Sequence, residues 1–385
     1  MRYRNSSASN ASQRKQIVVV SDALYQFSSG GKEERYRLLE DSFVSSEYEL
    51  IFATSQFWDE GNSPSNYFAI TNRRIGYKYG RRTITSGLSF ALSCLKVIKL
   101  NPTIIEADQM PSLALFPLWF VSRICRAKFS VTWNEVWNRK DWKNYLGTLG
   151  AVGYMIDKIA MRLPDMIISV SPLTTERLIA GGARADRIQS LKHLIDVNQI
   201  RKSKSDLPST DVLYTGRLLS HKRVDVLIRA IALLKEGGSV VTLTIIGEGP
   251  EGPFLRQLTK TLQIEEQVHF HDFFPDHTES WSLMNKCSIF DSPSEREGYG
   301  LAVAEAIASG IKVIAVDIET NASRLQFTSK EIGILLKENS PEQHAGAIKF
   351  ILDQKGGSRI SEEVVINSTS IGAQYLEYWE ILNAI

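Results

Sequence analysis

The stretch SEREGYGLAVAEAIASG, residues 294–310, is a glycine-spaced turn followed by a run of small apolar residues. The alanines suit a buried helix. A buried helix needs neither Gly298 and Gly300 in the turn before it nor the two glutamates, Glu297 just before the helix and Glu305 on it. We therefore expect these four residues to serve something that binds at the turn.

The chemistry of the stretch favours a ligand with phosphate in its middle. Glycines allow close backbone approach, and amides at the start of a helix attract phosphate oxygens. Five helical residues at about 1.5 Å each place Glu305 roughly 7 Å beyond Gly300 along the helix axis. The amides that we expect at the phosphates belong to Gly298, Tyr299, Gly300 and Leu301.

The two carboxylates favour hydroxyl groups on either side of that phosphate, because a carboxylate repels phosphate but accepts hydrogen bonds from sugar hydroxyls. A nucleotide sugar has this arrangement, with a ribose at one end, a hexose at the other and a diphosphate between them. On this interpretation Glu305 holds the ribose and Glu297 the transferred sugar. The alternative is a glutamate that caps the helix and a second glutamate on its solvated face.

Basic partners for a diphosphate lie in TGRLLSHKR, residues 215–223, which follows a predicted strand and precedes a predicted helix. This position places Arg217 and Lys222 at the carboxyl edge of a sheet, where a diphosphate needs cations. Each alone reads as a surface charge. Together with the residues of the glycine-spaced turn they form one coherent set.

The pattern along the chain predicts an α/β protein with two doubly wound domains joined near residue 205. The chain has 385 residues, of which 43% are apolar, which suits two or three globular domains. Short β-branched runs alternate with helical patterns in both halves, as in parallel sheets with crossover helices. The expected parts are a flexible basic N-terminus (1–15), an N-terminal acceptor-side domain (16–203), a C-terminal donor domain (204–369) and a C-terminal amphipathic helix that caps its own domain or crosses back to the first (370–385).

Cysteine usage and hydropathy predict a cytoplasmic protein. The three cysteines are widely spaced, which argues against a disulfide framework, and the N-terminus has no apolar signal core. The longest apolar window, residues 113–125, is interrupted by a proline, a serine and an arginine, which argues against a spanning helix of about 18 residues.

The net charge of +2 conceals a difference between the two halves. Residues 1–200 contain 26 Lys and Arg against 18 Asp and Glu, a net charge of +8, whereas residues 201–385 contain 19 against 25, a net charge of −6. The basic half suggests an anionic partner such as lipid head groups, or uneven surface charge without a partner. The run RRIGYKYGRR, residues 73–82, with the expected helix from Ile84 to Lys99, favours peripheral contact with an anionic membrane over a solvated loop.

Three other features carry weaker signals. His269 and His271 point to one face of a predicted strand, but a third ligand is lacking nearby, so we expect no metal site. Nucleic acid is not expected as a partner, because the C-terminal half is acidic and contains no recognised binding module. Three tryptophans either line a sugar-binding cleft or pack in the core, namely Trp133, Trp137 and Trp142.

The C-terminal half resembles the donor domain of the retaining family 4 glycosyltransferases. The resemblance covers about residues 211–351 and rests on YTGRLLSHKR, IIGEGPE, VHFHDF, SPSEREGYGLAVAEAIASG and GILLKENSPEQHAGAI. It implies the GT-B fold, in which two Rossmann-like domains face each other across a cleft. It also implies transfer of a hexose from a nucleoside diphosphate sugar to a hydroxyl acceptor with retention, in glycan, glycolipid or lipid-linked oligosaccharide synthesis, without a metal or other cofactor.

The N-terminal half resembles that family less closely. In SSGGKEER, residues 28–35, Gly30 and Gly31 would lie beside the donor phosphates, unless they form an ordinary turn. VTWNEVW, residues 131–137, resembles a segment in which the family often has a histidine, and this chain has Asn134 there and no histidine in residues 1–192. The asparagine can hydrogen-bond a sugar hydroxyl, but it cannot carry a proton.

A second departure is the segment IETNASR, residues 318–324, which lacks the family's usual paired glycines. The resemblance still assigns catalysis to Glu297, Arg217 and Lys222. Two other functions stay open at this point. One is a nucleotide-sugar-binding protein without catalysis, suggested by the two departures. The other is a sugar-nucleotide epimerase of the same fold, which would need no acceptor.

Overall fold

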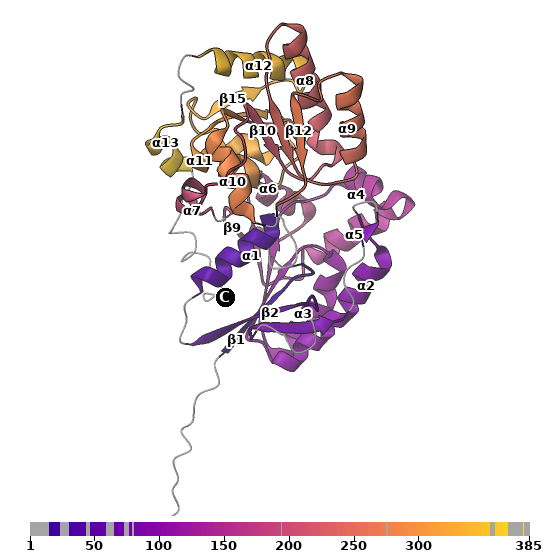
Figure 1. Ribbon diagram of the computed structural model, residues 1–385. Helices are drawn as coiled ribbons and strands as arrows, with labels where there is room; N and C mark the ends of the chain where they lie inside the picture. The colour runs from indigo at the N-terminus through magenta and orange to yellow at the C-terminus, as the bar shows by residue number, and fades with distance from the viewer. Residues whose placement is uncertain are drawn as a thin grey trace, which may run out of the picture.

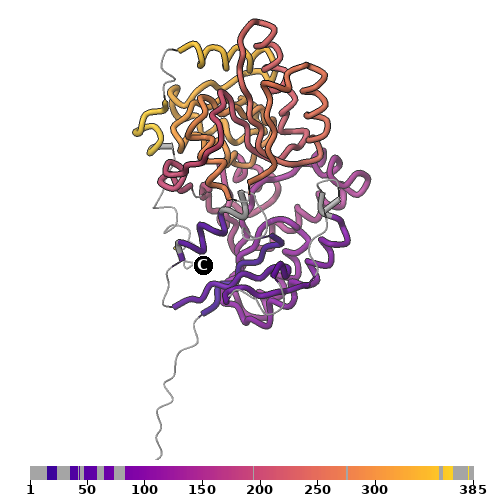
Figure 2. Tube along the Cα trace, viewed as in Figure 1, coloured from indigo at the N-terminus to yellow at the C-terminus, as the bar shows by residue number. Residues whose placement is uncertain are grey.

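A computed structural model of the protein shows two α/β domains, one above the other in Figure 1. It describes residues 15–23, 31–43, 47–58, 65–72, 77–78, 81–193, 195–274, 276–354, 359–368 and 380. In Figure 2 the first half of the chain, from indigo to magenta, forms the lower body, and the orange and yellow second half forms the upper body. The predicted N-terminal arm, Gly30 and almost all of the predicted C-terminal helix lie outside the described residues.

The first domain is built on a parallel sheet of seven strands, the arrangement that the alternating pattern predicts. Its strands, in spatial order, are β3 (Tyr67–Thr71), β2 (Tyr48–Ser55), β1 (Lys15–Val20), β6 (Ile104–Asp108), β7 (Lys128–Trp133), β8 (Met166–Ser169) and β9 (Ile188–Ser190). Two short strands, β4 (Tyr77–Lys78) and β5 (Arg81–Arg82), form a separate antiparallel pair.

Helices cover both faces of this sheet because successive strand residues point to opposite sides. Ile17 and Val19 of β1 face α1 (Gly31–Ser42), whereas Val18 and Val20 face the helices on the other side. The other helical segments of the domain are α2 (Ile84–Ser93), η1 (Cys94–Leu100), η2 (Ser112–Ala114), α3 (Leu115–Cys125), α4 (Arg139–Leu146), η3 (Gly147–Leu149), α5 (Gly150–Ala160), α6 (Pro172–Gly181) and η4 (Ala185–Arg187).

The second domain has a parallel sheet of six strands. They are, in spatial order, β12 (Val268–His271), β11 (Leu243–Ile246), β10 (Val212–Thr215), β13 (Ile289–Ser292), β14 (Lys312–Val316) and β15 (Gly333–Leu336). Its helical segments are α7 (Val197–Lys202), η5 (Ser220–Lys222), α8 (Val224–Glu236), α9 (Gly252–Thr261), α10 (His277–Lys286), α11 (Leu301–Ser309), η6 (Ala322–Gln326), α12 (Pro341–Asp353) and α13 (Glu362–Ser368).

The position of α7 differs from the predicted domain boundary at 203/204. Val197 and Ile200 are buried in the core of the second domain with residues of α10 and α11. Apolar burial therefore holds this short helix to the second domain, although the polar segment that suggested the boundary follows it.

The helix of the quoted stretch is α11. From Val303 to Ser309 every residue is buried, as its small apolar side chains predict. Gly300 and Gly310 flank the helix with φ of 86° and 80°, a left-handed conformation that glycine adopts without strain. The glycine at its N-terminal end turns the chain so that α11 begins at the carboxyl edge of the sheet.

Candidate functional site

A cavity of about 220 Å³ lies at the carboxyl ends of the second sheet's strands. It brings together six of the residues that the sequence predicts for the site, namely Arg217, Lys222, Glu297, Gly300, Leu301 and Glu305. The sequence analysis did not single out the other lining residues, which are Tyr214, Thr215, Gly216, Phe273, Phe274, His277, Ser280, Ser292, Ala302 and Val303. All of them come from the second domain.

Lys222 and Glu297 form an ion pair in this cavity, with 2.5 Å between Nζ and Oε1. The lysine ends η5, the turn that follows β10. The backbone of Glu297 is fixed against the 320–322 segment, since its amide bonds to the carbonyl of Thr320 and its carbonyl accepts from the amide of Ala322. The side chains are only 18% and 17% exposed, so both charges lie in a partly dehydrated setting.

Glu305 faces the same cavity from the first turns of α11. Its side chain accepts a hydrogen bond from the indole Nε1–H of Trp281 at 3.1 Å, and the residue is 9% exposed. Leu301 and Ala302 begin the helix and also line the cavity, and the first amides of a helix have no partner within it. The carboxylate of Glu305 and the N-terminal end of α11 thus face the same cavity.

Three positive charges act on His221, the residue before Lys222. Burial is the largest cause that lowers the pKa of His221, the charges of Arg296, Lys222 and Arg217 act in the same direction, and together they bring it to about 3. The imidazole is therefore neutral at physiological pH. Two of these cations, Arg217 and Lys222, line the cavity.

Gly298 lies at the contact between the two domains and does not line the cavity. A Cβ atom at Gly298 would lie 1.8 Å from the backbone oxygen of Asn134 in the first domain. Its own carbonyl accepts hydrogen bonds from Ser171 Oγ at 2.6 Å and Thr174 Oγ1 at 3.3 Å, both on the first domain. Because Gly298 has no side chain, the backbone of the first domain can come close to it.

Asn134 and Tyr299 also lie outside the cavity lining. The side-chain amide of Asn134 lies 3.5 Å from Asp108 Oδ1, and its backbone amide bonds to Gln109. The ring of Tyr299 packs with the core of the second domain, and its centroid is 5.1 Å from that of His193. Burial raises the pKa of the Tyr299 hydroxyl well above its usual value.

His193 corrects the expectation that the first domain supplies no imidazole. It follows β9, the last strand of the first sheet, and is 8% exposed. Burial, followed by the charge of Arg35, lowers its pKa to about 3. Residues 1–192 contain no histidine, but the predicted first domain extends to residue 203 and therefore includes His193. The histidine is neutral and lies at the domain contact, away from the cavity lining.

Arg296, which was not predicted from the sequence, links the two domains. Its Nε lies 2.6 Å from Glu135 Oε1 and its Nη1 lies 2.5 Å from Asp141 Oδ1, both in the first domain. Its guanidinium carbon is 5.5 Å from the ring centre of Trp137. Burial raises the pKa of Glu135, while Arg296 acts in the opposite direction by favouring the carboxylate. The only sequence signal was an arginine between Glu295 and Glu297 in the quoted stretch.

A buried ionic cluster lies at the carboxyl ends of the first sheet's central strands. Arg35, on α1, donates to Glu106 at 2.9 Å and to Thr132 at 2.6 Å, and its Nη1 is 3.8 Å from Asp108. Arg35 and Glu106 are 5% and 0% exposed. Gly31 is the first residue of α1, so this cluster fixes the helix that follows the predicted glycine turn.

Two of the three tryptophans, Trp133 and Trp142, follow the core-packing alternative, whereas Trp137 is half-buried. Trp133 is fully buried, and Trp142 is 6% exposed with its Nε1–H bonded to Asp157 at 2.9 Å. Trp137 contacts Trp142 edge to face, with 5.1 Å between ring centres. The three cysteines are free thiols.

Two features are absent from the part of the chain that the structure describes. No group of three or more His, Cys, Asp or Glu side chains there could hold a metal ion. None of the helices there is long and apolar enough to cross a membrane.

Comparisons with known proteins agree with this architecture. Residues 196–367 match the family model for glycosyl transferases group 1. The crystal structure of Anabaena HepE in complex with UDP and glucose superposes with a TM-score of 0.73 over 97% of this chain and 100% of that one, at 17% identity. The chain therefore has the two-domain GT-B fold of these enzymes.

Two curated relatives match over part of their length. An uncharacterised glycosyltransferase of Haemophilus influenzae is 29% identical over 160 residues, which is 42% of this chain and 43% of the relative. The GDP-mannose:cellobiosyl-diphosphopolyprenol alpha-mannosyltransferase of Komagataeibacter xylinus is 28% identical over 144 residues, 37% of this chain and 36% of the relative. The chain thus aligns with less than half the length of these relatives.

Proposed function

We propose that this chain, whose C-terminal domain belongs to the group 1 glycosyl transferases, moves a hexose from a nucleoside diphosphate sugar to a hydroxyl acceptor with retention at the anomeric carbon. The observation that carries the proposal is the composition of the donor-domain cavity. Two cations, the first turn of a helix and two carboxylates line one space of about 220 Å³.

The donor diphosphate fits between the cations and the helix start. Arg217 and Lys222 would neutralise its charge, and the amides at Leu301 and Ala302 would add hydrogen bonds from the positive end of α11. The pairing of Lys222 with Glu297 is compatible with this role, because a diphosphate would compete with the carboxylate for the ammonium group.

The two ends of the donor would meet different walls of the cavity. The carboxylate of Glu305, at the α11 end, would accept hydrogen bonds from the ribose hydroxyls, while that of Glu297 would accept them from the hexose. Phe273 and Phe274 follow β12 and offer flat apolar surface to a nucleobase, which stacks on aromatic rings. Anabaena HepE, which has this fold, was solved with UDP and glucose.

Catalysis would rest on stabilising the leaving group. As the bond between the anomeric carbon and the diphosphate oxygen breaks, the negative charge that develops meets Arg217, Lys222 and the amides of α11. The acceptor oxygen bonds to the same face of that carbon, and its proton passes to the departing diphosphate. Glu297 would orient the hexose and favour its developing positive charge.

The proposal extends to partners and location. A glycan or lipid-linked glycan is the acceptor that we propose, and the relative from Komagataeibacter xylinus is named for a diphosphopolyprenol acceptor. We further propose that the protein works in the cytoplasm, in peripheral contact with an anionic membrane, and that it needs neither a metal nor nucleic acid.

The test is the release of nucleoside diphosphate from a panel of UDP-, GDP- and ADP-sugars, with and without lipid extract of the host membrane. We expect release from one donor class that increases with the extract. Tight donor binding with no release under any condition would favour a binding protein and would contradict the proposal. Interconversion of the donor sugar without any acceptor would contradict it in favour of an epimerase.

A further inference from the structure

Exposed apolar side chains are concentrated on a few helical segments of the first domain. Of the 18 large apolar side chains that are exposed in the described part of the chain, 12 lie on α2, η1, α3, η3 and α5. They are Ile84, Leu88, Leu92, Leu95, Ile98, Trp119, Phe120, Ile124, Leu149, Val152, Met155 and Ile159. We call these 12 side chains the apolar face.

The segments of the apolar face are neighbours. Their inner sides pack together on one face of the first sheet, where Phe90, Val97, Leu118 and Ala160 share a core. α2 contacts α3, and both α2 and α5 contact the short turn η2. Because the inner sides share one core, the outer sides form one surface of the domain, along which α2 and α5 are visible in Figure 1. Isolated exposed apolar side chains need no explanation, but a gathered set marks an interaction surface.

On these five segments, which lie within the described range 81–193, every charged side chain that is exposed or half-buried is basic. Their exposed or half-buried charged side chains are Lys96, Lys99, Arg123 and Lys158, of which Arg123 forms an ion pair with Asp165 in the loop before β8. The one acidic residue is Asp157, which is 4% exposed and accepts hydrogen bonds from Ser112 and Trp142 inside the domain. Apolar side chains interleaved with basic ones are complementary to a surface that is apolar inside and anionic at its boundary.

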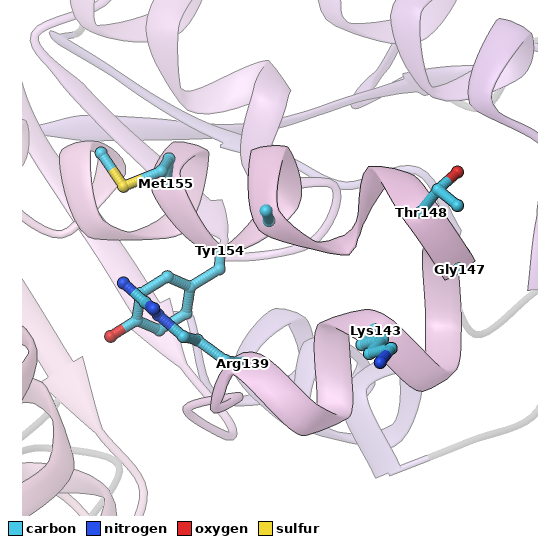
Figure 3. Close-up of a pocket in the computed structure, with 7 residues that line it drawn as sticks. Arg139, Lys143, Gly147, Thr148, Tyr154 and Met155 are labelled. Atoms are coloured by element: carbon cyan, nitrogen blue, oxygen red, sulfur yellow. The ribbon is translucent and has the colours of Figure 1, made fainter.

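A second cavity, of about 310 Å³, opens next to the apolar face between α4 and the η3–α5 segment. Figure 3 shows Arg139 and Lys143 on one side of it, with Thr148, Tyr154 and Met155 on the other. Met155 belongs to both the cavity and the apolar face. The cavity therefore places two cationic side chains, Arg139 and Lys143, beside the apolar face, and Arg139 stacks on the ring of Tyr154 with 5.2 Å to its centre.

We infer that the apolar face docks on an anionic lipid bilayer, with its apolar side chains in the interface and its lysines and arginines at the phosphates. Trp119 and Phe120 suit that depth, because aromatic rings favour the boundary between head groups and acyl chains. The charge pattern favours lipid over a second copy of this chain, since two such faces would bring like charges together. This inference rests on the membrane contact in the proposed function and names the surface that makes it. Docking through this face needs no donor, so it can fail while the proposed transfer reaction stands.

The test is flotation of the full chain with vesicles of phosphatidylcholine, with or without one third phosphatidylglycerol. We expect at least about tenfold stronger partition to the anionic vesicles, and a decline as salt rises from about 0.05 to 0.5 M and screens the charges. The triple variant Leu92→Ser, Leu95→Ser, Phe120→Ser should lose at least about tenfold in partition. The double variant Lys96→Glu, Lys99→Glu should lose the preference for phosphatidylglycerol.

The matched control is Val240→Ser, Phe254→Ser, Phe350→Ser, which removes three comparably exposed apolar side chains from the second domain. It should partition like the wild type, and unchanged circular dichroism should show that all variants are folded. Failure of the wild type to bind anionic vesicles, or full binding by the triple variant, would overturn the inference. A concentration-dependent dimer that the triple variant abolishes, without vesicle binding by the wild type, would overturn it in favour of self-association.

Discussion

The ammonium group of Lys222 lies 2.5 Å from the carboxylate of Glu297, although the two residues are 75 positions apart and belong to separate loops. Each is expected to meet a different part of a donor, the lysine the diphosphate and the glutamate the sugar. Their pairing balances one positive and one negative charge in the cavity. A diphosphate that takes over the lysine would release the glutamate toward the hexose, so donor binding and catalytic positioning would be one event.

Replacing Lys222 with Met should weaken nucleoside diphosphate binding by roughly 10- to 100-fold, because a charge-assisted bond is lost and Glu297 is left unpaired beside the phosphates. Isothermal titration with the diphosphate of the preferred donor measures this. Lys349→Met is a suitable control, since Lys349 forms an exposed ion pair on α12, far from the cavity lining. Equal affinities for the two variants would contradict the assignment of Lys222.

Substitution of Gly298 by Ala should separate transfer from donor binding. The new Cβ would overlap the backbone oxygen of Asn134, which lies 1.8 Å from its ideal position, so the two domains could not keep their contact. We expect turnover to fall at least about tenfold, since small displacements at a site are costly, while nucleotide affinity stays near that of the wild type.

Gly346→Ala provides the opposite control in the same domain. Gly346 lies inside α12 and has nothing within 4 Å of an added Cβ, so alanine should stabilise the protein by about 0.5 to 1 kcal/mol without affecting turnover. If both variants turned over donor like the wild type, the domain contact at Gly298 would have no part in transfer.

Loss of Arg296 should destabilise the domain contact. Arg296→Met leaves Glu135 buried without its cation, and breaking a mostly buried pair of this kind should lower the free energy of unfolding by about 2 kcal/mol. Chemical denaturation measures this change. Arg184→Met, which removes an exposed pair with Asp186, should have no measurable effect. The account of the domain contact would be wrong if the two variants were equally stable.

The buried imidazole of His221 should make the protein less stable in acid. The pKa of His221 is about 3 in the folded chain and 6.5 for an unperturbed imidazole, so the unfolded chain binds the proton first as pH falls. The stabilising contribution is complete above about pH 6.5 and is lost progressively toward pH 3. Over that window it should amount to roughly 2 to 4 kcal/mol.

The measurement for His221 is the free energy of unfolding of the wild type and of His221→Gln between about pH 4 and 7.5. Glutamine does not titrate, so the difference between the two proteins should shrink as the pH falls. A difference that stays constant across this range would show that the imidazole does not titrate as its burial requires.

The sequence predicted the sheets and much of the donor site because both depend on local patterns. Apolar strands, glycine turns and a small-residue helix were enough to place Arg217, Lys222, Glu297 and Glu305 at one edge of a parallel sheet. Such positions follow from topology, since the carboxyl ends of parallel strands share an edge.

The contacts between domains could not be predicted in the same way. Gly298 appeared to make room for phosphate, whereas the structure places the backbone of Asn134 against it. Arg296 gave no pattern of its own, because its partners Glu135 and Asp141 lie far away in the sequence. Contacts of this kind depend on how the two folded domains pack against each other. A single sequence carries no signal for that packing.

The role of Glu297 is tested most directly by comparing turnover and nucleotide affinity in Glu297→Ala with those in Glu295→Ala. Glu295 lies two residues earlier, pairs with Arg223 and is absent from the cavity lining. We predict that Glu297→Ala lowers turnover at least about 100-fold and binds nucleoside diphosphate at least as tightly as the wild type, while Glu295→Ala keeps both near wild-type values. Turnover by Glu297→Ala equal to that of the wild type would contradict the account.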